Sequence, residues 1–206
     1  MPSFHDFRFL STDGKHNVFA RECTPDGEVR AVLQIAHGVA EHIYRYAPFM
    51  EFLAENGFVV VANDHLGHGK TAENEQELCF FAEKDGWNDV VSDMDTLHKL
   101  TAAKYPGVPY FLFGHSMGSF LTRTYIIDHP EGLKGVVISG TGQNPGAVVA
   151  AGKLMAKLEM IDNGPMYHSP TLDKLAFGSY NKKYDHVRTK LDWLTRDEAI
   201  VDQYIA

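Results

Sequence analysis

Cysteine is scarce in this sequence, and basic side chains are outnumbered by acidic ones. Cys23 and Cys79 are too few for a disulfide framework and too far apart for a CxxC redox or zinc motif. The 19 lysines and arginines stand against 27 aspartates and glutamates and are scattered along the chain, so a nucleic-acid partner is not expected. No apolar run approaches the ~18 residues that span a bilayer, and a secretory signal pattern is missing. These absences predict a cytoplasmic protein without a transmembrane segment.

The composition that remains is that of a folded domain. The chain has 206 residues, of which 44% are hydrophobic and 22% charged, which excludes disordered and collagen-like classes. A chain of this length buries roughly 70% of the surface that it exposes when unfolded. We therefore expect a sizeable core that needs no disulfide or metal to hold it.

Apolar runs alternate with helical patterns over the first two thirds of the chain. Residues 31–36 and 58–62 are near-continuous apolar runs, which is typical of parallel strands covered on both faces. Further strands are expected over 110–113 and 133–139. Helices are expected between these strands, over about 46–53, over 87–101 and from Ser116 onward, and residues 5–11 and 17–21 predict an antiparallel edge hairpin. The order predicts an α/β fold with a doubly wound, mostly parallel sheet.

The pattern changes after Gly140. No further buried-strand run occurs from Gln143 onward; helical stretches over 148–158 and 191–200 flank a loop that contains Gly164-Pro165 and Ser169-Pro170. We therefore predict a core of residues 1–142 and a helical cap region of residues 143–206.

The strongest chemical signal is Gly114-His115-Ser116-Met117-Gly118. This G-x-S-x-G follows a predicted strand and opens a predicted helix, which is the context in which a serine is exposed as a nucleophile above a sheet. Small residues at both glycine positions permit the sharp turn. The alternative is a turn in which Ser116 only caps the helix. Because strand, motif and helix follow in order, we favour the nucleophile.

A second signal, His37-Gly38-Val39-Ala40-Glu41-His42, follows directly after a predicted buried strand. The loop at this place can present a backbone N–H to the carbonyl oxygen of a bound ester, and Val39 with Met117 is the predicted pair of donors. For His37 and His42 we favour loop histidines that hold backbone carbonyls over a role as catalytic base.

The segment Asp64-His65-Leu66-Gly67-His68-Gly69-Lys70 admits a metal site, because the two histidines lie three residues apart. No cysteine or carboxylate cluster completes a coordination sphere within the motif, and its two glycines favour a tight structural turn. We expect a structural role here and no cofactor. The two cysteines are interpreted as ordinary, partly buried thiols.

In this order, HGxxEH, DHxGHG and GHSMG resemble the motifs of the α/β-hydrolase superfamily, specifically serine hydrolases of the monoacylglycerol lipase and lysophospholipase type. The resemblance extends over essentially the whole chain, including segments 177–181 and 192–197, which are similar to cap segments of bacterial members. It implies that Ser116 is the nucleophile, that Val39 and Met117 are the oxyanion-hole donors, and that Glu41 and His42 brace the loop. It also implies an acyl ester with a small polar headgroup as substrate.

The resemblance leaves the triad incomplete. Members of the superfamily place the acid and the histidine after the nucleophile, on loops that follow two further strands, and no such strands are predicted here. A rewired triad could draw on His129, His168 or His186, which lie on the nucleophile's helix or in cap sequence. A fragment, a second chain that completes the fold, or a natural truncation would each explain the short length. An uncovered sheet edge would favour a homodimer. The alternatives to an esterase are a peptidase or polar-ester hydrolase of the same fold and a non-catalytic binding module.

Overall fold

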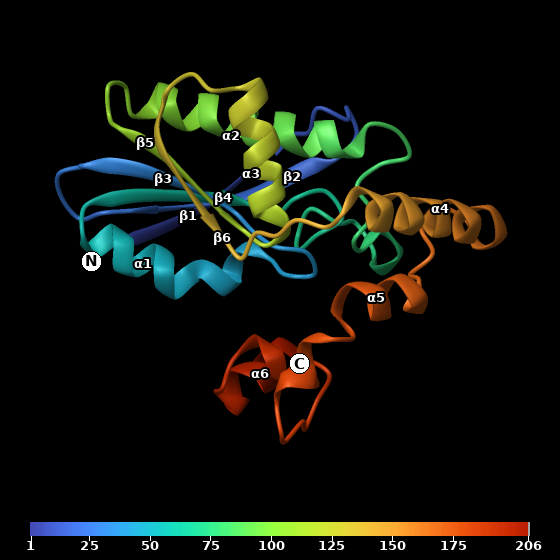
Figure 1. The fold of residues 1–206 in the computed structure, drawn as a ribbon. Coiled ribbons are helices and arrows are strands. Elements are labelled where there is room, and N and C mark those ends of the chain that lie inside the picture. Colours follow the sequence, from blue (N-terminus) through green and yellow to red (C-terminus); the bar gives the residue numbers. More distant parts are fainter. Residues whose placement is uncertain (206) are drawn as a thin grey trace. The chain divides into compact units, whose positions relative to one another are not determined.

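The computed structural model describes residues 1–205, in which six strands form one sheet (Figure 1). The spatial order is β1-β2-β4-β3-β5-β6; the first two pairings in this order are antiparallel and the other three are parallel. The strands are β1 (Ser3–Leu10), β2 (Asn17–Thr24), β3 (Ala31–Ala36), β4 (Phe58–Asn63), β5 (Tyr110–His115) and β6 (Leu133–Ser139). The mostly parallel sheet with an antiparallel hairpin at one edge confirms the predicted fold class.

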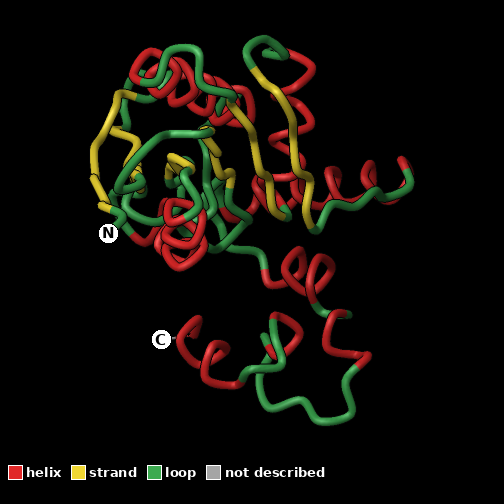
Figure 2. Tube along the Cα trace, turned by 90° about the vertical axis from the view of Figure 1, so that its left-hand side faces the viewer, coloured by secondary structure: helices red, strands yellow, loops and turns green. Residues whose placement is uncertain are grey.

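Helices cover both faces of this sheet. The first unit contains η1 (Ile43–Tyr46), α1 (Ala47–Glu55), η2 (Glu75–Glu77), α2 (Gly86–Lys104) and α3 (Met117–Asp128). Figures 1 and 2 show α1 on one face and α2 and α3 on the other. The sheet is therefore doubly wound, as predicted. Strand β6 is the edge strand on the parallel side of the sheet among the described residues, and its Val137 and Ile138 are exposed.

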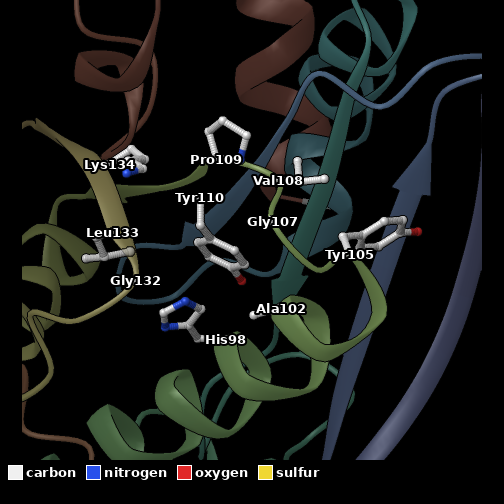
Figure 3. Close-up of a pocket in the computed structure, with 10 residues that line it drawn as sticks. All are labelled: His98, Ala102, Tyr105, Gly107, Val108, Pro109, Tyr110, Gly132, Leu133 and Lys134. Carbon is white, nitrogen blue, oxygen red and sulfur yellow. The ribbon is translucent and has the colours of Figure 1, made fainter.

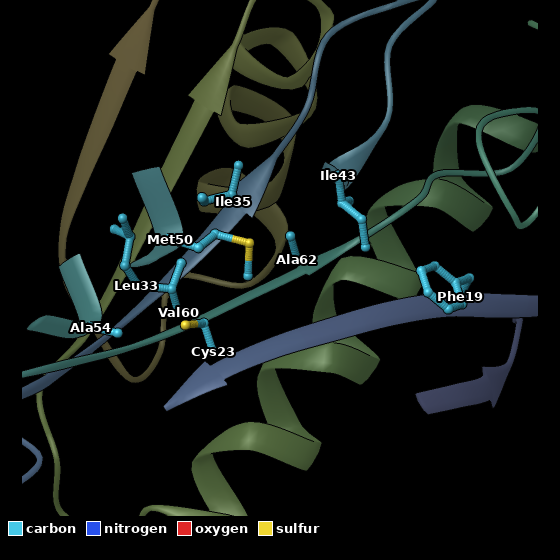
Figure 4. Close-up of a cluster of buried hydrophobic side chains, with 9 residues drawn as sticks. All are labelled: Phe19, Cys23, Leu33, Ile35, Ile43, Met50, Ala54, Val60 and Ala62. Carbon is cyan, nitrogen blue, oxygen red and sulfur yellow. The ribbon is translucent and has the colours of Figure 1, made fainter. Parts of the chain in front are cut away.

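Alternate side chains of the central strands enter two different cores. Leu33 and Val60 pack with Met50 of α1 in the cluster that Figure 4 shows, whereas Val32 and Val59 pack on the opposite face. Each fully buried aliphatic side chain contributes about 1.5–3 kcal/mol. Burial on both faces explains why these strands have no polar alternation in the sequence.

One polar side chain interrupts this apolar interior. Gln34 of β3 is buried, and its amide group donates to the carbonyl oxygen of Met94 in α2 at 2.9 Å while its oxygen accepts from the hydroxyl of Tyr110 at 2.6 Å. Because both ends of the amide are paired, burial costs little, and β3, β5 and α2 are tied together.

The chain divides into two compact units, Met1–Gln143 and Asn144–Ala206, and residues 144–205 are the described part of the second. Its elements are α4 (Gly146–Asn163), α5 (Pro170–Phe177), η3 (Tyr180–Lys183), η4 (Asp192–Leu194) and α6 (Glu198–Ile205). Phe177, Tyr180 and Trp193 form an aromatic cluster, with ring centroids 4.7–6.2 Å apart.

Helix α5 was not expected from the sequence, where Ser169-Pro170 indicated a loop. Pro170 instead occupies the first helical position, and Ser169 caps the helix by accepting a hydrogen bond from the backbone N–H of Leu172 at 2.9 Å. Proline is tolerated there because the first helical N–H has no partner within the helix.

Candidate active site

Ser116 lies at the sharp turn between β5 and α3. Its backbone has φ of 52° and ψ of −118°, a strained conformation for a residue with a Cβ atom. The turn is held by a hydrogen bond from the Ser116 backbone N–H to the carbonyl oxygen of Ser139 at 2.9 Å. Within residues 1–205 the Ser116 side chain does not cap α3. This geometry speaks against the alternative that the serine is a helix cap.

Both glycines of the motif are required by close contacts. A Cβ atom at Gly114 would lie 2.3 Å from Oγ1 of Thr122, and one at Gly118 would lie 2.0 Å from the carbonyl oxygen of Ala36. Helix α3 thus begins directly against the end of β3. The two strand ends are neighbours in the sheet, since Ala36 pairs with Gly114.

The loop after β3 lies against the serine. A Cβ atom at Gly38 would be 3.1 Å from Cβ of Ser116, closer than an ordinary contact, so the loop backbone passes close to the predicted nucleophile. Among residues 1–205, the backbone–backbone hydrogen bonds of turns, loops and helix caps include none donated by the N–H of Val39 or Met117. Both N–H groups are therefore available as donors, one directly after Ser116 and one directly after Gly38, which is compatible with the predicted oxyanion hole.

The side chain of Glu41 fixes this loop by accepting hydrogen bonds. Its buried carboxylate accepts the backbone N–H of Gly38 at 2.5 Å, the guanidinium of Arg45 at 2.6 Å and the hydroxyl of Tyr46 at 2.7 Å. Burial and the adjacent carboxylate raise the pKa of Tyr46, which stays protonated as a donor. Three donors balance the buried carboxylate.

His37 is fully buried under the same loop. Its Nδ1 lies 2.7 Å from the carbonyl oxygen of Gly38, and its Nε2 accepts the backbone N–H of His65 at 3.0 Å. Burial, with the rings of His65 and His68 close by, lowers the pKa of His37 well below its usual range. His37 holds a backbone carbonyl, as expected. His42 does not: its side chain is exposed and makes no hydrogen bond to a carbonyl within the described part of the chain.

The segment after β4 is a structural turn. Asp64 accepts the backbone N–H groups of Ile43 and Lys70, each at 2.8 Å, and a Cβ atom at Gly69 would lie 2.2 Å from its carboxylate. Burial lowers the pKa of His65 to about 3. Residues 1–205 contain no group of three histidine, cysteine or acidic side chains placed to hold a metal ion.

Of the remaining predicted histidines, two have partners other than the Ser116 hydroxyl and two belong to the second unit. His115 places Nδ1 3.4 Å from the hydroxyl of Ser139. His129 follows the far end of α3, a helix of 12 residues and so about 18 Å long, and its Nδ1 lies 3.7 Å from Asp95. His168 and His186 belong to the second unit.

The expectation for the cysteines was wrong, because neither thiol is partly buried. Cys23 is completely enclosed in the core beneath α1, and Cys79 is exposed. The sequence around Cys23 alternates too weakly to show that both faces of β2 are covered.

A pocket of about 420 Å³ opens at the opposite end of the sheet from Ser116 (Figure 3). Tyr110 and Leu133, which begin β5 and β6, line it together with His98 of α2. The rings of His98 and Tyr110 have centroids 4.2 Å apart, and Nδ1 of His98 is 2.7 Å from the hydroxyl of Tyr125. This pocket therefore takes no part in chemistry at Ser116.

None of the helices between residues 1 and 205 combines the length and apolar character that crossing a bilayer requires.

Known proteins place this chain in a family. Residues 27–206 match the model of the family described as "Serine aminopeptidase, S33". A monoglyceride lipase of Mus musculus is 32% identical over 129 residues, which are 63% of this chain and 40% of the relative. A monoacylglycerol lipase of Mycolicibacterium smegmatis is 33% identical over 140 residues, 66% of this chain and 48% of the relative.

The structural match covers more of the chain. A carboxyl esterase of Bacillus coagulans superimposes with a TM-score of 0.87 at 32% identity, over 98% of this chain and 65% of the esterase. In the two sequence comparisons, the chain spans about half the length of the curated relatives it matches. Together with the strained serine turn, these matches show that the chain belongs to the serine aminopeptidase S33 family of α/β-hydrolase serine hydrolases.

Proposed function

We propose that the protein containing this chain is a serine esterase that cleaves monoacylglycerol or lysophospholipid-like esters through an acyl-enzyme on Ser116. The observation that carries the proposal is the strained backbone of Ser116, whose side chain lies close to the loop at Gly38. Such a turn costs about 1–3 kcal/mol and persists at functional sites.

In the proposed reaction, the hydroxyl oxygen of Ser116 attacks the acyl carbonyl while a base removes its proton. The N–H groups of Val39 and Met117 stabilise the resulting oxyanion, at about 3 kcal/mol for each donor. The alkoxide leaves with the proton from the base, and water then hydrolyses the acyl-enzyme.

The proposed reaction needs a base and a carboxylate, and within residues 1–205 the Ser116 hydroxyl makes no hydrogen bond to a side chain of either kind. We propose that both come from sequence that the longer relatives have and this chain does not span. The first unit supplies the nucleophile and the oxyanion hole.

The proposed substrate class is supported by the names of the lipase relatives and by the second unit, which we propose acts as a cap. Helix α4 carries exposed apolar side chains, among them Leu154 and Leu158. Leu158→Asp should weaken hydrolysis of dodecanoyl esters while leaving acetyl esters unaffected. Equal losses for both would argue against an acyl-binding cap.

The complete protein tests the esterase proposal directly. We expect it to hydrolyse p-nitrophenyl esters of graded chain length, and Ser116→Ala should remove this activity. Ser92→Ala is the matched control, because Ser92 is a half-buried serine of α2 outside the turn at Ser116. Hydrolysis that survives Ser116→Ala would refute the proposed nucleophile.

The description of the matching family favours a second candidate, an aminopeptidase. The same Ser116 and oxyanion hole would then attack an amide, and the leaving group would be an amine. Aminoacyl p-nitroanilides distinguish the candidates: turnover of these, without turnover of alkyl esters, would replace the esterase proposal.

A further inference from the structure

We propose that His37 is a positioning residue that fixes the orientation of the Gly38–Val39 peptide and so aims the Val39 N–H at the acyl oxygen. The inference rests on the proposed oxyanion hole and deepens it, because it assigns what orients one of the two donors. His37 itself contacts no substrate atom in this scheme.

The hydrogen bonds of His37 determine where its proton lies. A backbone N–H can only donate, so the contact at 3.0 Å from the His65 N–H makes Nε2 the acceptor. In a neutral imidazole the other nitrogen then carries the proton. Nδ1–H therefore donates to the carbonyl oxygen of Gly38 at 2.7 Å.

That carbonyl belongs to the same peptide unit as the predicted donor. In a trans peptide, the C=O of Gly38 and the N–H of Val39 point in opposite directions. A hydrogen bond that holds the carbonyl inward, toward the buried imidazole, consequently turns the Val39 N–H outward, away from His37. The contact of Gly38 with Ser116 places this peptide beside the nucleophile.

The hydrogen bond from His37 to the Gly38 carbonyl is needed because the backbone at Gly38 can rotate easily. Gly38 has no Cβ atom, so its peptide can rotate at little cost, and Ala40 already has φ of 54° in this short loop. Glu41 accepts the N–H of Gly38, which fixes the preceding peptide unit. Of the two peptide units that flank Gly38, only the following one contains the Val39 N–H, and His37 holds that one.

Burial keeps His37 in the form that this arrangement requires. The ring is fully enclosed, with the ring of His65 4.2 Å and that of His68 5.2 Å away between centroids. A proton on Nε2 would place two donors against each other at the His65 N–H. The enclosure thus favours the neutral ring with a single donor, directed at Gly38.

Two conservative variants separate this role from simple packing. In His37→Asn, the side-chain amide nitrogen occupies the place of Nδ1 and can still donate to Gly38, whereas the acceptor for the His65 N–H is lost. His37→Gln reaches the place of Nε2 and leaves the Gly38 carbonyl without a donor. His98→Asn is the matched control, because His98 is a buried histidine at the opposite end of the sheet.

We expect His37→Gln in the complete protein to lower kcat for a p-nitrophenyl ester about 100-fold with KM changed less than threefold. His37→Asn should retain kcat within about tenfold, and His98→Asn should leave it unchanged. Equal losses of kcat in the two His37 variants would overturn the inference while Ser116→Ala still supports the proposed function. Activity that survives Ser116→Ala would instead refute the proposed function.

A second measurement needs no catalysis. Long-range proton–nitrogen correlation spectra of the 206-residue chain at pH 7 should show a protonated Nδ1 and a bare Nε2 for His37. The opposite tautomer, or a charged ring, would overturn the inference whatever the kinetic result.

Discussion

Gly118→Ala tests the close approach of α3 to β3 on which the proposed oxyanion hole depends. The new Cβ atom would lie 2.0 Å from the carbonyl oxygen of Ala36 and 2.6 Å from that of His37, where ordinary contact begins near 3.4 Å. Both atoms belong to backbone, so side-chain rotation cannot relieve the overlap. The start of α3 and the end of β3 must separate by about 1 Å or more.

Two consequences of different size follow from that separation. Overpacking of a close-packed interior costs about 1–3 kcal/mol, so the urea midpoint of the chain, followed by circular dichroism, should fall. Because Met117 and the loop after His37 move apart, the two predicted donors no longer converge on one oxygen. A displacement of about 1 Å can cost about 100-fold in rate, and we expect kcat of the complete protein to fall by that much.

Gly152→Ala is the control for the same chemical change in a helix. Nothing lies within 4 Å of a Cβ atom at this position of α4, so alanine should stabilise the helix by about 0.5–1 kcal/mol and leave kcat unchanged. If Gly118→Ala unfolds at the same urea concentration as the unsubstituted chain and the enzyme turns over at the same rate, the described contact between α3 and β3 is wrong.

Three further predictions concern other buried groups and the hydroxyl of Ser116. Burial raises the pKa of Asp93 from 3.8 to about 6, so its ionised form destabilises the fold, and Asp93→Asn should raise the free energy of unfolding at pH 7 by up to about 3 kcal/mol. This difference should shrink as pH falls through 6 toward 4, where the native carboxyl is protonated; a pH-independent difference in urea unfolding contradicts it. Glu41→Ala leaves the buried Gly38 N–H without its acceptor, which should lower the free energy of unfolding by about 1–3 kcal/mol. This variant should also lower kcat far more than Glu41→Gln, because the glutamine oxygen can still accept the hydrogen bond. Equal values of kcat for the two variants would refute this expectation. The 206-residue chain alone should not be labelled stoichiometrically at Ser116 by a fluorophosphonate within minutes, because within residues 1–205 no base is hydrogen-bonded to its hydroxyl. Rapid labelling, followed by mass spectrometry, would show that a base is present.

The sequence predicts the central strands well because a strand that is buried on both faces consists almost entirely of apolar residues. Residues 31–36 are apolar apart from Gln34, residues 58–62 are apolar throughout, and both segments lie in central strands. It predicts the serine turn because strand, glycine, serine and helix follow one another along the chain. Helix α5 was missed although its signals are local, since Ser169-Pro170 is compatible with a turn as well as with a helix start.

The interior of the candidate site depends on contacts between distant segments, and periodicity along one segment carries no information about these. The sequence indicated that His37 holds a backbone carbonyl, but the proton position follows only from its second partner, the N–H of His65, 28 residues away. His42 has the same residue type in the same loop and is exposed. The difference arises because the turn after β4 closes over His37 alone, so the tertiary packing of β3 and β4 decides which histidine can act on the loop. The oxyanion hole that we propose is therefore a property of two adjacent strand ends together, and its geometry should respond to changes in the turn at Asp64 as well as to changes in the loop itself.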